Sequence, residues 1–419
     1  MKDIQIKKLI EAEKNRQKKV INLIASENYV SKDVLEALGT ELTNKYAEGY
    51  PAKRYYGGNE IIDEIEILCQ TRALELFDLA EKSKGSQDRS QAGKWSVNVQ
   101  ALSGSPANVA VYLAVLPQGG KIMGMSLDHG GHLTHGHKVS ITGKVWKQVP
   151  YGVDKNTEMI NYEELMAKAI AEKPGVIVAG FTAYPRVVDF KKFREIADAS
   201  GALLMVDMSH FAGLVAGKEY PSPFEYADIV TTTTHKTLRG PRSALIFTKK
   251  GVTIASGEKG EKKEISSLVD KAVFPGMQGG PHMNQIAGVA VALKEAKSAD
   301  FKKYAKQVKK NAKVLAEELA KRGWRIISGG TDSHLILIDT WMEGKKNEKG
   351  AGAVAGKSAS DKLEKAGIIV NKNAIPFDTR PPVDPSGIRL GTAAETTHVK
   401  KEKDFVKIAE RIDKILKGE

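Results

Sequence analysis

The chain has 419 residues, of which 41% are hydrophobic and 27% charged, the usual balance of a globular protein in water. This length predicts two domains instead of one core. No apolar run is long enough to span a bilayer, and residues 1–20 lack the apolar stretch of a signal peptide, so we expect a cytoplasmic protein with no membrane partner. The single cysteine, Cys69, excludes an internal disulfide and fits a reducing compartment.

The net charge of +13 raises the question of a nucleic-acid partner. The excess comes mostly from scattered lysines, which are densest at 301–321, at 343–358 and near the C-terminus. No basic patch is interleaved with aromatic residues, and no nucleic-acid motif is recognisable. We therefore interpret the lysines as solvated helix faces and expect no nucleic acid, with attraction of anionic small molecules as a second interpretation.

Alternating strands and helices are predicted along much of the chain. Cys69 falls in a helical pattern, and Ser105 and Pro106 suit the N-cap and first position of a helix through the apolar run 109–116. Further on, a helix is expected at 190–200, and strands are expected at 176–181, 202–206, 228–234 and 244–248. Strands that are separated by helix-length segments imply right-handed crossovers and a largely parallel sheet.

The domain organisation follows from a change of pattern near residue 285. Residues 284–324 are helical in pattern and rich in alanine and lysine, and strands are expected again at 335–338 and 368–370. We predict an N-terminal arm or helix (1–25), a large α/β domain with a mostly parallel central sheet flanked by helices (26–285) and a smaller α+β C-terminal domain (286–419). Two stretches rich in Lys, Gly and Ser, 80–94 and 343–358, predict inserted surface loops.

Lys236 is the most informative residue of the chain. It follows the β-branched run 229–234, and Thr233 and His235 stand beside it. A catalyst that forms a Schiff base needs an amine that is fixed, partly desolvated and near other cationic groups, so that enough of it is neutral to attack a carbonyl. For Lys236 alone, an exposed lysine at a strand end is the simpler alternative.

Asp207 supplies a partner for this lysine, because it also ends a predicted strand and parallel sheets bind their ligands at that edge. Its carboxylate could simply cap a turn or helix. Beside a Schiff-base lysine it could instead pair with a protonated pyridine nitrogen. At about 4 Å and an effective dielectric near 20, such a pair is worth on the order of 4 kcal/mol before desolvation, enough to keep the ring electron-poor.

The segment 102–108 (LSGSPAN) precedes the apolar run 109–116. Unpaired N–H groups and the dipole at a helix start attract a phosphate, so the segment is a candidate phosphate site, with a plain capped helix as the alternative. Four histidines in 129–137 (HGGHLTHGH) invite a metal site. Their glycines leave no regular spacing that aims the rings at one ion, so we predict no metal, and the favoured use of one ring is stacking on a flat cofactor.

Two further segments carry side chains that suit a small substrate. Arg389 lies in an apolar stretch and could bind a carboxylate bidentately or form an interdomain salt bridge. The segment 45–58 combines Glu48 with clustered tyrosines. In an active site it would offer a proton shuttle and stacking surfaces, and otherwise it would be a polar loop.

Together these segments resemble the serine hydroxymethyltransferase family, pyridoxal-phosphate enzymes with the aspartate-aminotransferase fold. The resemblance covers nearly the whole chain. It is carried by the segments 23–28 (LIASEN), 43–51 (TNKYAEGYP), 129–136 (HGGHLTHG), 231–236 (TTTTHK), 278–281 (QGGP), 370–373 (VNKN) and 387–391 (GIRLG).

The resemblance implies roles for the residues around the cofactor ring. Lys236 would bind pyridoxal 5'-phosphate covalently, with Thr233 and His235 beside it as further catalytic residues. His132 would stack on the pyridine ring, and Asp207 would pair with its nitrogen.

Other matching positions would bind the rest of the cofactor and the substrates. His210 and Thr182, which stands where the family usually has serine, would lie near the phenolic oxygen. The phosphate would be bound by Ser103, Gly104 and Ser105, and by Tyr46, Gly279 and Gly280 of the neighbouring subunit. The amino acid would be bound by Ser26, Tyr56 and Arg389. The folate would be bound by Glu48, Tyr55, Leu127, Gly131, His132, Leu133 and Asn373, with Glu48 also moving protons near the substrate hydroxyl.

The resemblance thus implies reversible transfer of the serine hydroxymethyl carbon to tetrahydrofolate, giving glycine and 5,10-methylenetetrahydrofolate. A site shared between subunits implies a homodimer, possibly within a tetramer. The chain departs from the family pattern at 381–383 (PPV), a stretch that often reads SPF and touches the folate, and at Met277, often a glycine. The alternatives are therefore a modified pterin as carrier, or a related pyridoxal-phosphate enzyme such as a threonine aldolase.

Overall fold

The computed structural model describes residues 1–80, 93–256 and 260–419, and the chain divides into two compact units. The large unit consists of residues 28–306, and the small unit consists of residues 1–27 and 307–419. The helix α11 (Ala299–Lys321) begins in the large unit and ends in the small one. The domain boundaries expected near residues 25 and 285 stay predictions, and residue 285 lies inside α10 (Met283–Ala296).

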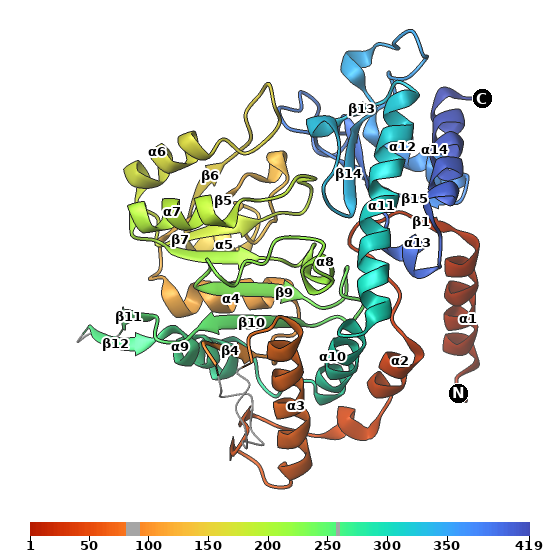
Figure 1. Ribbon diagram of the computed structural model, residues 1–419. Helices are drawn as coiled ribbons and strands as arrows, with labels where there is room; N and C mark the ends of the chain where they lie inside the picture. Colours follow the sequence, from red (N-terminus) through yellow and green to blue (C-terminus); the bar gives the residue numbers. More distant parts are fainter. Residues whose placement is uncertain (81–92, 257–259) are drawn as a thin grey trace. The chain divides into compact units, whose positions relative to one another are not determined.

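The large unit is built on a central sheet that has seven strands in the described part of the chain (Figure 1). In spatial order they are β4 (Trp95–Asn98), β10 (Ala244–Lys249), β9 (Ile229–Thr233), β8 (Leu203–Asp207), β7 (Val176–Gly180), β5 (Lys121–Met125) and β6 (Lys147–Tyr151). Only β10 among these runs against the others. The expected α/β fold with a mostly parallel sheet is confirmed.

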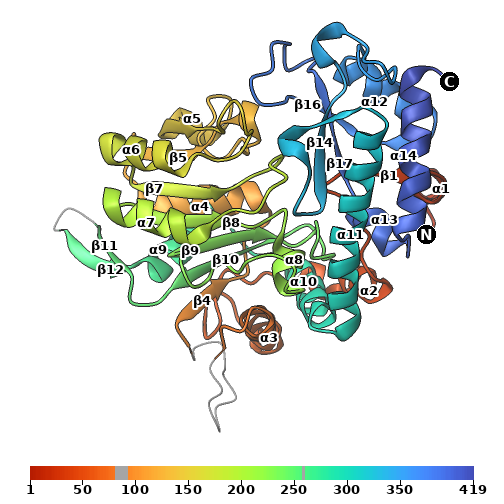
Figure 2. The same cartoon turned by 45° about the horizontal axis from the view of Figure 1, so that its top comes forward.

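Helices cover both faces of this sheet. Figures 1 and 2 show α6 (Tyr162–Glu172) and α7 (Phe190–Ser200) on one face, and α4 (Gly104–Val115) and α9 (Ile265–Lys271) on the other. The remaining elements of the large unit are α2 (Lys32–Leu38), η1 (Glu41–Asn44), β2 (Gly49–Tyr50), β3 (Lys53–Arg54), α3 (Glu60–Leu76), η2 (Leu127–His129), α5 (Ile141–Val145), α8 (Ala212–Ala216), β11 (Thr253–Ser256), β12 (Glu261–Glu264) and η3 (Ala272–Met277).

The local sequence explains why these elements form. All five residues of β7 are buried, as expected for a parallel strand that is covered on both faces. The side chain of Asp189 caps α7 by accepting the Lys192 N–H at 3.1 Å, and Gly201, at φ 73°, ends the helix in the left-handed conformation. The helix at 190–200 and the strands β7, β8, β9 and β10 confirm the predictions to within a residue or two.

The small unit joins the first residues of the chain to its C-terminal part. Its four-stranded antiparallel sheet has the order β13 (Arg325–Ile326), β14 (Leu335–Asp339), β17 (Gly387–Gly391) and β16 (Asn371–Asn373). Its other elements are α1 (Ile4–Lys19), β1 (Ile21–Asn22), η4 (Ile327–Gly329), η5 (Met342–Gly344), α12 (Gly356–Lys365), β15 (Ile368–Ile369), α13 (Ala393–Thr397) and α14 (Glu402–Lys417). β1 pairs with β15 in parallel, which places residues 21–22 in this unit.

The two predicted surface loops have different outcomes. Residues 81–92 of the first stretch lie outside the described residues. The second, 343–358, is a surface loop only in part. Ala351 and Val354 are buried in the core of the small unit with Trp324 and Phe405, and α12 begins at Gly356. The prediction was wrong for 351–358 because the flanking lysines and glycines hid a short apolar stretch that packs inward. Across the described residues, no helix is long and apolar enough to cross a membrane.

Candidate active site

The carboxyl ends of neighbouring strands in the central sheet meet at one pocket of about 270 Å³. The loops that follow β4, β5, β7, β8 and β9 each contribute to it. Ten residues that the sequence singled out line this pocket: Ser103, Gly104, Ser105, His132, Thr182, Asp207, His210, Thr233, His235 and Lys236. Asn108, Phe181, Ser209 and Arg242 complete the lining.

The start of α4 forms one wall of the pocket. The prediction that Ser105 caps this helix was wrong by two positions, since Ser103 has the extended N-cap conformation and the helix begins at Gly104. Pro106 is tolerated at the third position because the first intrahelical bond runs from the Ala107 N–H to the Ser103 carbonyl, 3.0 Å apart. The N–H groups of Gly104 and Ser105 therefore precede the helical ladder, where a helix start attracts an anion.

Gly104 is also the residue that lets this helix start approach the sheet. A Cβ atom at Gly104 would lie 2.6 Å from Cγ2 of Thr233, at the end of β9. Any larger residue would push the helix start away from the strand that leads to Lys236. The close approach of α4 to β9 at the pocket therefore requires glycine at position 104.

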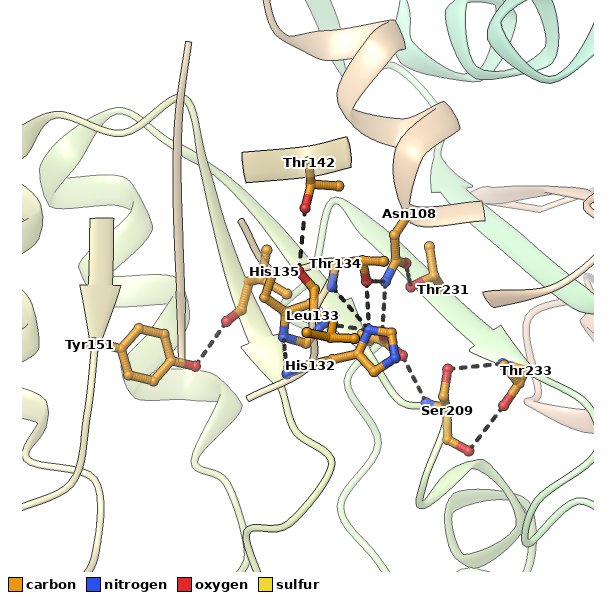
Figure 3. Close-up of polar contacts among 12 residues, drawn as sticks. Asn108, His132, Leu133, Thr134, His135, Thr142, Tyr151, Ser209, Thr231 and Thr233 are labelled. Carbon is orange, nitrogen blue, oxygen red and sulfur yellow. Dashed lines mark hydrogen bonds and ion pairs between the residues drawn. The ribbon is translucent and has the colours of Figure 1, made fainter. Parts of the chain in front are cut away.

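Asp207 ends β8, and its carboxylate is held by three neighbours, Asn108, His135 and Ser209, which are labelled in Figure 3. Oδ2 accepts from Asn108 Nδ2 at 2.9 Å and from His135 Nε2 at 3.2 Å, and Oδ1 accepts the Ser209 N–H at 3.0 Å. Burial raises the pKa of the Asp207 carboxyl, but the hydrogen bond from His135 and the nearby basic groups, Lys236 among them, outweigh it and hold the pKa well below its usual value. Asp207 is therefore a carboxylate at neutral pH.

His132 lies in the loop after β5 and is oriented by Thr134. Nδ1 of His132 lies 2.7 Å from the Thr134 hydroxyl and accepts the Thr134 N–H at 3.2 Å. Asn108 donates to the same hydroxyl at 2.9 Å, and its own carbonyl oxygen accepts from Thr231 at 2.8 Å. Sequence reasoning did not assign roles to Asn108, Thr134 or Thr231, and the only signal was a polar Asn108 at the edge of an apolar run.

The backbone around Lys236 is fixed from several sides. Its carbonyl accepts from Asn28 Nδ2 at 2.9 Å and from the Arg239 N–H at 3.1 Å. On the following residue, the Thr237 hydroxyl donates to the His210 carbonyl at 2.9 Å. Lys236 lines the pocket together with Asp207 and the start of α4, and its backbone is held in place as a Schiff-base lysine requires.

His235 is mostly buried beside two cations. Burial, followed by the positive charges of Lys236 and Arg242, lowers the pKa of His235 to about 3. The imidazole is therefore neutral across the physiological range. A neutral ring next to Lys236 adds no positive charge to a pocket that already holds an ammonium and a guanidinium.

This pKa makes stability depend on pH. Between pH 6.5, where an unfolded histidine titrates, and about pH 3, the unfolded chain binds a proton at His235 that the folded protein does not. Stability is therefore lost as pH falls through this window, by up to about 1.4 kcal/mol per pH unit from this group. We expect His235→Gln to flatten the slope of unfolding free energy against pH, measured by urea denaturation of the cofactor-free protein. His282→Gln, at an exposed position, is the control; equal slopes for wild type and His235→Gln would contradict the prediction.

A second group of predicted residues gathers elsewhere in the large unit. A Cβ at Gly279 would lie 3.4 Å from Oε1 of Glu48, and one at Gly280 would lie 3.6 Å from the ring of Tyr46. The rings of Tyr46 and Tyr56 meet edge to face with centroids 5.4 Å apart. This group lies on the surface, since Tyr46, Tyr55 and Tyr56 are 58%, 72% and 50% exposed.

The segment that carries this second group is anchored by Arg54. Its buried guanidinium donates to the carbonyls of Ala47 and Gly49, at 2.9 and 2.8 Å, and forms ion pairs with Asp63 and the fully buried Glu66, at 2.9 and 2.6 Å. These bonds fix the backbone on both sides of Glu48. Sequence reasoning missed this anchor because Arg54 read as one more cation in a polar segment.

The predicted folate residues Leu127, Gly131 and Leu133 lie in the same loop as His132. A Cβ at Gly131 would lie 1.9 Å from the Met125 carbonyl oxygen, so only glycine lets the loop turn back over the end of β5. Leu133 is 41% exposed. Among the residues that the structure describes, no group of three or more His, Cys, Asp or Glu side chains could hold a metal ion.

Ser26, Asn373 and Arg389 lie in the small unit. The guanidinium of Arg389 is buried in β17, and its Nε donates to Oδ1 of Asn371 on the neighbouring strand at 3.1 Å. Burial lowers the pKa of Arg389 to about 10, so it is cationic at neutral pH. Ala25, next to Ser26, packs against Gly391, where a Cβ would lie 2.3 Å from the Ala25 Cα. The segment of Ser26 therefore runs past the end of β17.

The pocket of the large unit fits pyridoxal phosphate. It offers a helix start for a phosphate, a buried carboxylate for a ring nitrogen and a lysine amine for an aldehyde. A site of this kind at the carboxyl edge of a mostly parallel sheet defines the class of pyridoxal-phosphate enzymes with an aspartate-aminotransferase-like fold.

Comparison with known proteins points to a single family within this class. The family model described as serine hydroxymethyltransferase matches residues 1–412. A protein of Desulfotalea psychrophila named serine hydroxymethyltransferase is 51% identical over 414 residues, 99% of this chain and 88% of the relative. One of the same name from Koribacter versatilis is 52% identical over 403 residues, 96% of this chain and 86% of the relative. The chain belongs to the serine hydroxymethyltransferase family, whose members depend on pyridoxal phosphate and use tetrahydrofolate as co-substrate.

Proposed function

We propose that this chain catalyses the reversible transfer of the hydroxymethyl carbon of serine to tetrahydrofolate, giving glycine and 5,10-methylenetetrahydrofolate. The observation that carries the proposal is the convergence of Lys236, Asp207 and the start of α4 on one pocket. Membership of the family supports the substrates. The chain would act in the cytoplasm as part of one-carbon and amino-acid metabolism.

The residues of the pocket divide the work. Bound pyridoxal phosphate supplies an electron sink for the pair released when the Cα–Cβ bond of serine breaks. The Lys236 amine holds the cofactor and accepts or returns a proton, while the carboxylate of Asp207 holds a proton on the ring nitrogen. Ser103, Gly104 and Ser105 bind the phosphate, His132 stacks on the ring, and Thr182 and His210 bind its phenolic oxygen, with Thr233 and His235 shaping the surroundings of Lys236.

The substrates are assigned to the remaining predicted residues. Ser26, Tyr56 and Arg389 would bind the amino acid, with the guanidinium of Arg389 holding its carboxylate. Glu48 moves protons at the serine hydroxyl and, with Tyr55, contacts the folate. The pterin is bound by Leu127, Gly131, His132, Leu133 and Asn373.

A homodimer would complete the site, and a tetramer could contain two such dimers. Tyr46, Glu48, Gly279 and Gly280 lie together and are not among the residues that line the pocket of their own chain. The exposed tyrosines beside them favour a second copy as the covering partner. In that arrangement Tyr46, Gly279 and Gly280 reach the phosphate of the neighbouring subunit.

The decisive test compares carbon acceptors. Purified protein with pyridoxal phosphate is given serine together with tetrahydrofolate or a modified pterin, and glycine formation is measured; threonine without folate is a third arm. Fast glycine formation with tetrahydrofolate supports the proposal. Faster glycine formation with the modified pterin would show that this pterin, and not tetrahydrofolate, is the carbon acceptor. Threonine cleavage together with a serine reaction that tetrahydrofolate does not accelerate would indicate an aldolase.

Arg389→Ala is expected to raise the serine concentration needed for half-maximal rate by about 10²-fold, because charge-assisted bonds to a carboxylate are worth about 1.5–3 kcal/mol each. Arg389→Lys keeps the positive charge but loses the planar guanidinium, so its serine concentration for half-maximal rate should lie between those of the wild type and Arg389→Ala. Arg16→Ala, which removes an exposed ion pair with Glu13 in the same unit, is the control. Steady-state kinetics with varied serine gives the answer, and an unchanged serine dependence in Arg389→Ala would refute the carboxylate clamp.

A further inference from the structure

Asp207 and His132 are connected through two buried polar side chains, Asn108 and Thr134. Figure 3 shows Asn108, Thr134 and His132 side by side. Each link is a hydrogen bond of 2.7–2.9 Å: Asp207 to Asn108, Asn108 to Thr134 and Thr134 to His132. The two ends of this chain of bonds are the acid proposed to hold the ring nitrogen and the imidazole proposed to stack on the ring. The inference rests on that proposed function.

The donor and acceptor in each hydrogen bond follow from the bond between Asn108 and Asp207. The ionised carboxylate of Asp207 only accepts, so the amide nitrogen of Asn108 must face it. The carbonyl oxygen of Asn108 then faces Thr231, whose hydroxyl donates to it at 2.8 Å. The opposite orientation of the amide would set its oxygen against the carboxylate and lose the bond to Asp207, whereas the Thr231 hydroxyl can donate or accept.

The second N–H of Asn108 fixes the hydroxyl of Thr134. That N–H donates to the Thr134 oxygen, so the hydroxyl proton points away from Asn108 and towards Nδ1 of His132. The backbone N–H of Thr134 also donates to Nδ1, at 3.2 Å. A ring nitrogen that accepts from two donors carries no proton itself.

We propose that Asn108 and Thr134 are positioning residues that hold His132 as the neutral imidazole with its proton on Nε2, and that the charge of Asp207 sets their orientation. A neutral ring can stack on an electron-poor pyridine without opposing the proton that Asp207 keeps on the ring nitrogen. The Asp207 carboxylate would thereby influence two groups. It would hold the proton on the ring nitrogen directly, and it would set the tautomer of His132 through Asn108 and Thr134.

The test reads the tautomer of His132 directly. Nitrogen-15 NMR of histidine-labelled protein distinguishes Nδ1–H from Nε2–H imidazole, and His132→Asn identifies the signals of His132 among the nine histidines. The cofactor-free wild type is expected to show Nε2–H, and Nδ1–H in the wild type would overturn the proposal without any variant. Thr134→Val, which has the same shape but no hydroxyl, is expected to raise the ratio of Nδ1-protonated to Nε2–H imidazole about tenfold.

Two variants control for local damage. Thr134→Ser restores the hydroxyl and should restore the wild-type signals. Thr142→Val removes another buried hydroxyl near the same loop, one that donates to the Leu133 carbonyl and to Ser140, and should leave the His132 signals unchanged. Identical His132 signals in wild type and Thr134→Val would overturn the inference.

A second readout links the tautomer to the cofactor. The dissociation constant for pyridoxal phosphate, followed by its absorbance, is expected to rise about tenfold in Thr134→Val and to recover in Thr134→Ser. Wild-type serine cleavage is measured in parallel. If the wild type forms no glycine, the proposed function fails, whereas the NMR result on the cofactor-free protein decides the tautomer inference independently.

Discussion

Lys236→Ala is expected to lower the rate of glycine formation from serine by about 10²–10⁴-fold. The amine of Lys236 is proposed both to hold the cofactor and to carry a proton during the reaction, and alanine does neither. The backbone at this position is fixed by Asn28 and by the turn at Arg239, so the loop should keep its shape when the side chain is shortened. The loss would then reflect missing chemistry and not a collapsed pocket.

The measurement has a chemical and a kinetic part. Borohydride reduction of the holoprotein, followed by peptide analysis, should label the peptide with Lys236 in the wild type and leave it unlabelled in Lys236→Ala. Lys303→Ala removes an exposed lysine that pairs with Asp300 and serves as the control for lysine loss in general. A full rate in Lys236→Ala, or label on a different peptide of the wild type, would refute the assignment.

Asp207→Asn is expected to lower the turnover number by about 10³-fold. An ion pair worth on the order of 4 kcal/mol at about 4 Å corresponds to about three powers of ten in rate, if the proton it holds is needed in the transition state. Asparagine has nearly the same shape, and its single carbonyl oxygen can still accept either from Asn108 or from the Ser209 N–H, which bond to different oxygens of Asp207. The change therefore removes the charge with little loss of packing.

The readout should separate chemistry from binding. The turnover number is measured at saturating serine and pyridoxal phosphate, together with the absorbance of the bound cofactor, which reports its ring protonation. Asp154→Asn, in an exposed turn, is the control for loss of a carboxylate. Unchanged turnover with unchanged absorbance in Asp207→Asn would show that the acid does not hold the ring proton.

The sequence was sufficient to bring Asp207 and Lys236 to one pocket because both residues stand directly at strand ends. A buried strand such as β8 is a continuous apolar run, and the first polar residue after it, Asp207, stands at the carboxyl edge. The same reasoning places Lys236 after β9. In a parallel sheet the carboxyl ends of all strands lie at the same edge. Residues that directly follow different strands therefore lie close together there, even when they are far apart in the chain.

The supporting residues could not be found in that way. Asn108 is one turn inside a helix, and its three hydrogen bonds go to residues from three other segments, which no local pattern encodes. Arg54 binds carbonyl oxygens, and these have no sequence signature. The start of α4 was misplaced because Ser-Pro is a strong local signal, whereas the contact of Gly104 with Thr233 is set by packing.

The return from β9 to β10 has a consequence for how the enzyme moves. The two strands are antiparallel neighbours from Thr233 and Ala244 onward, so Lys236 lies in the connection 234–243 between paired strands and not at the head of a crossover helix. Its backbone carbonyl accepts from Asn28 and from the Arg239 N–H, so we expect the amine to move mainly by rotation of its own four-carbon side chain. If Lys236 binds and releases the cofactor in each catalytic cycle, we expect its side chain to move while the backbone of the connection keeps its position.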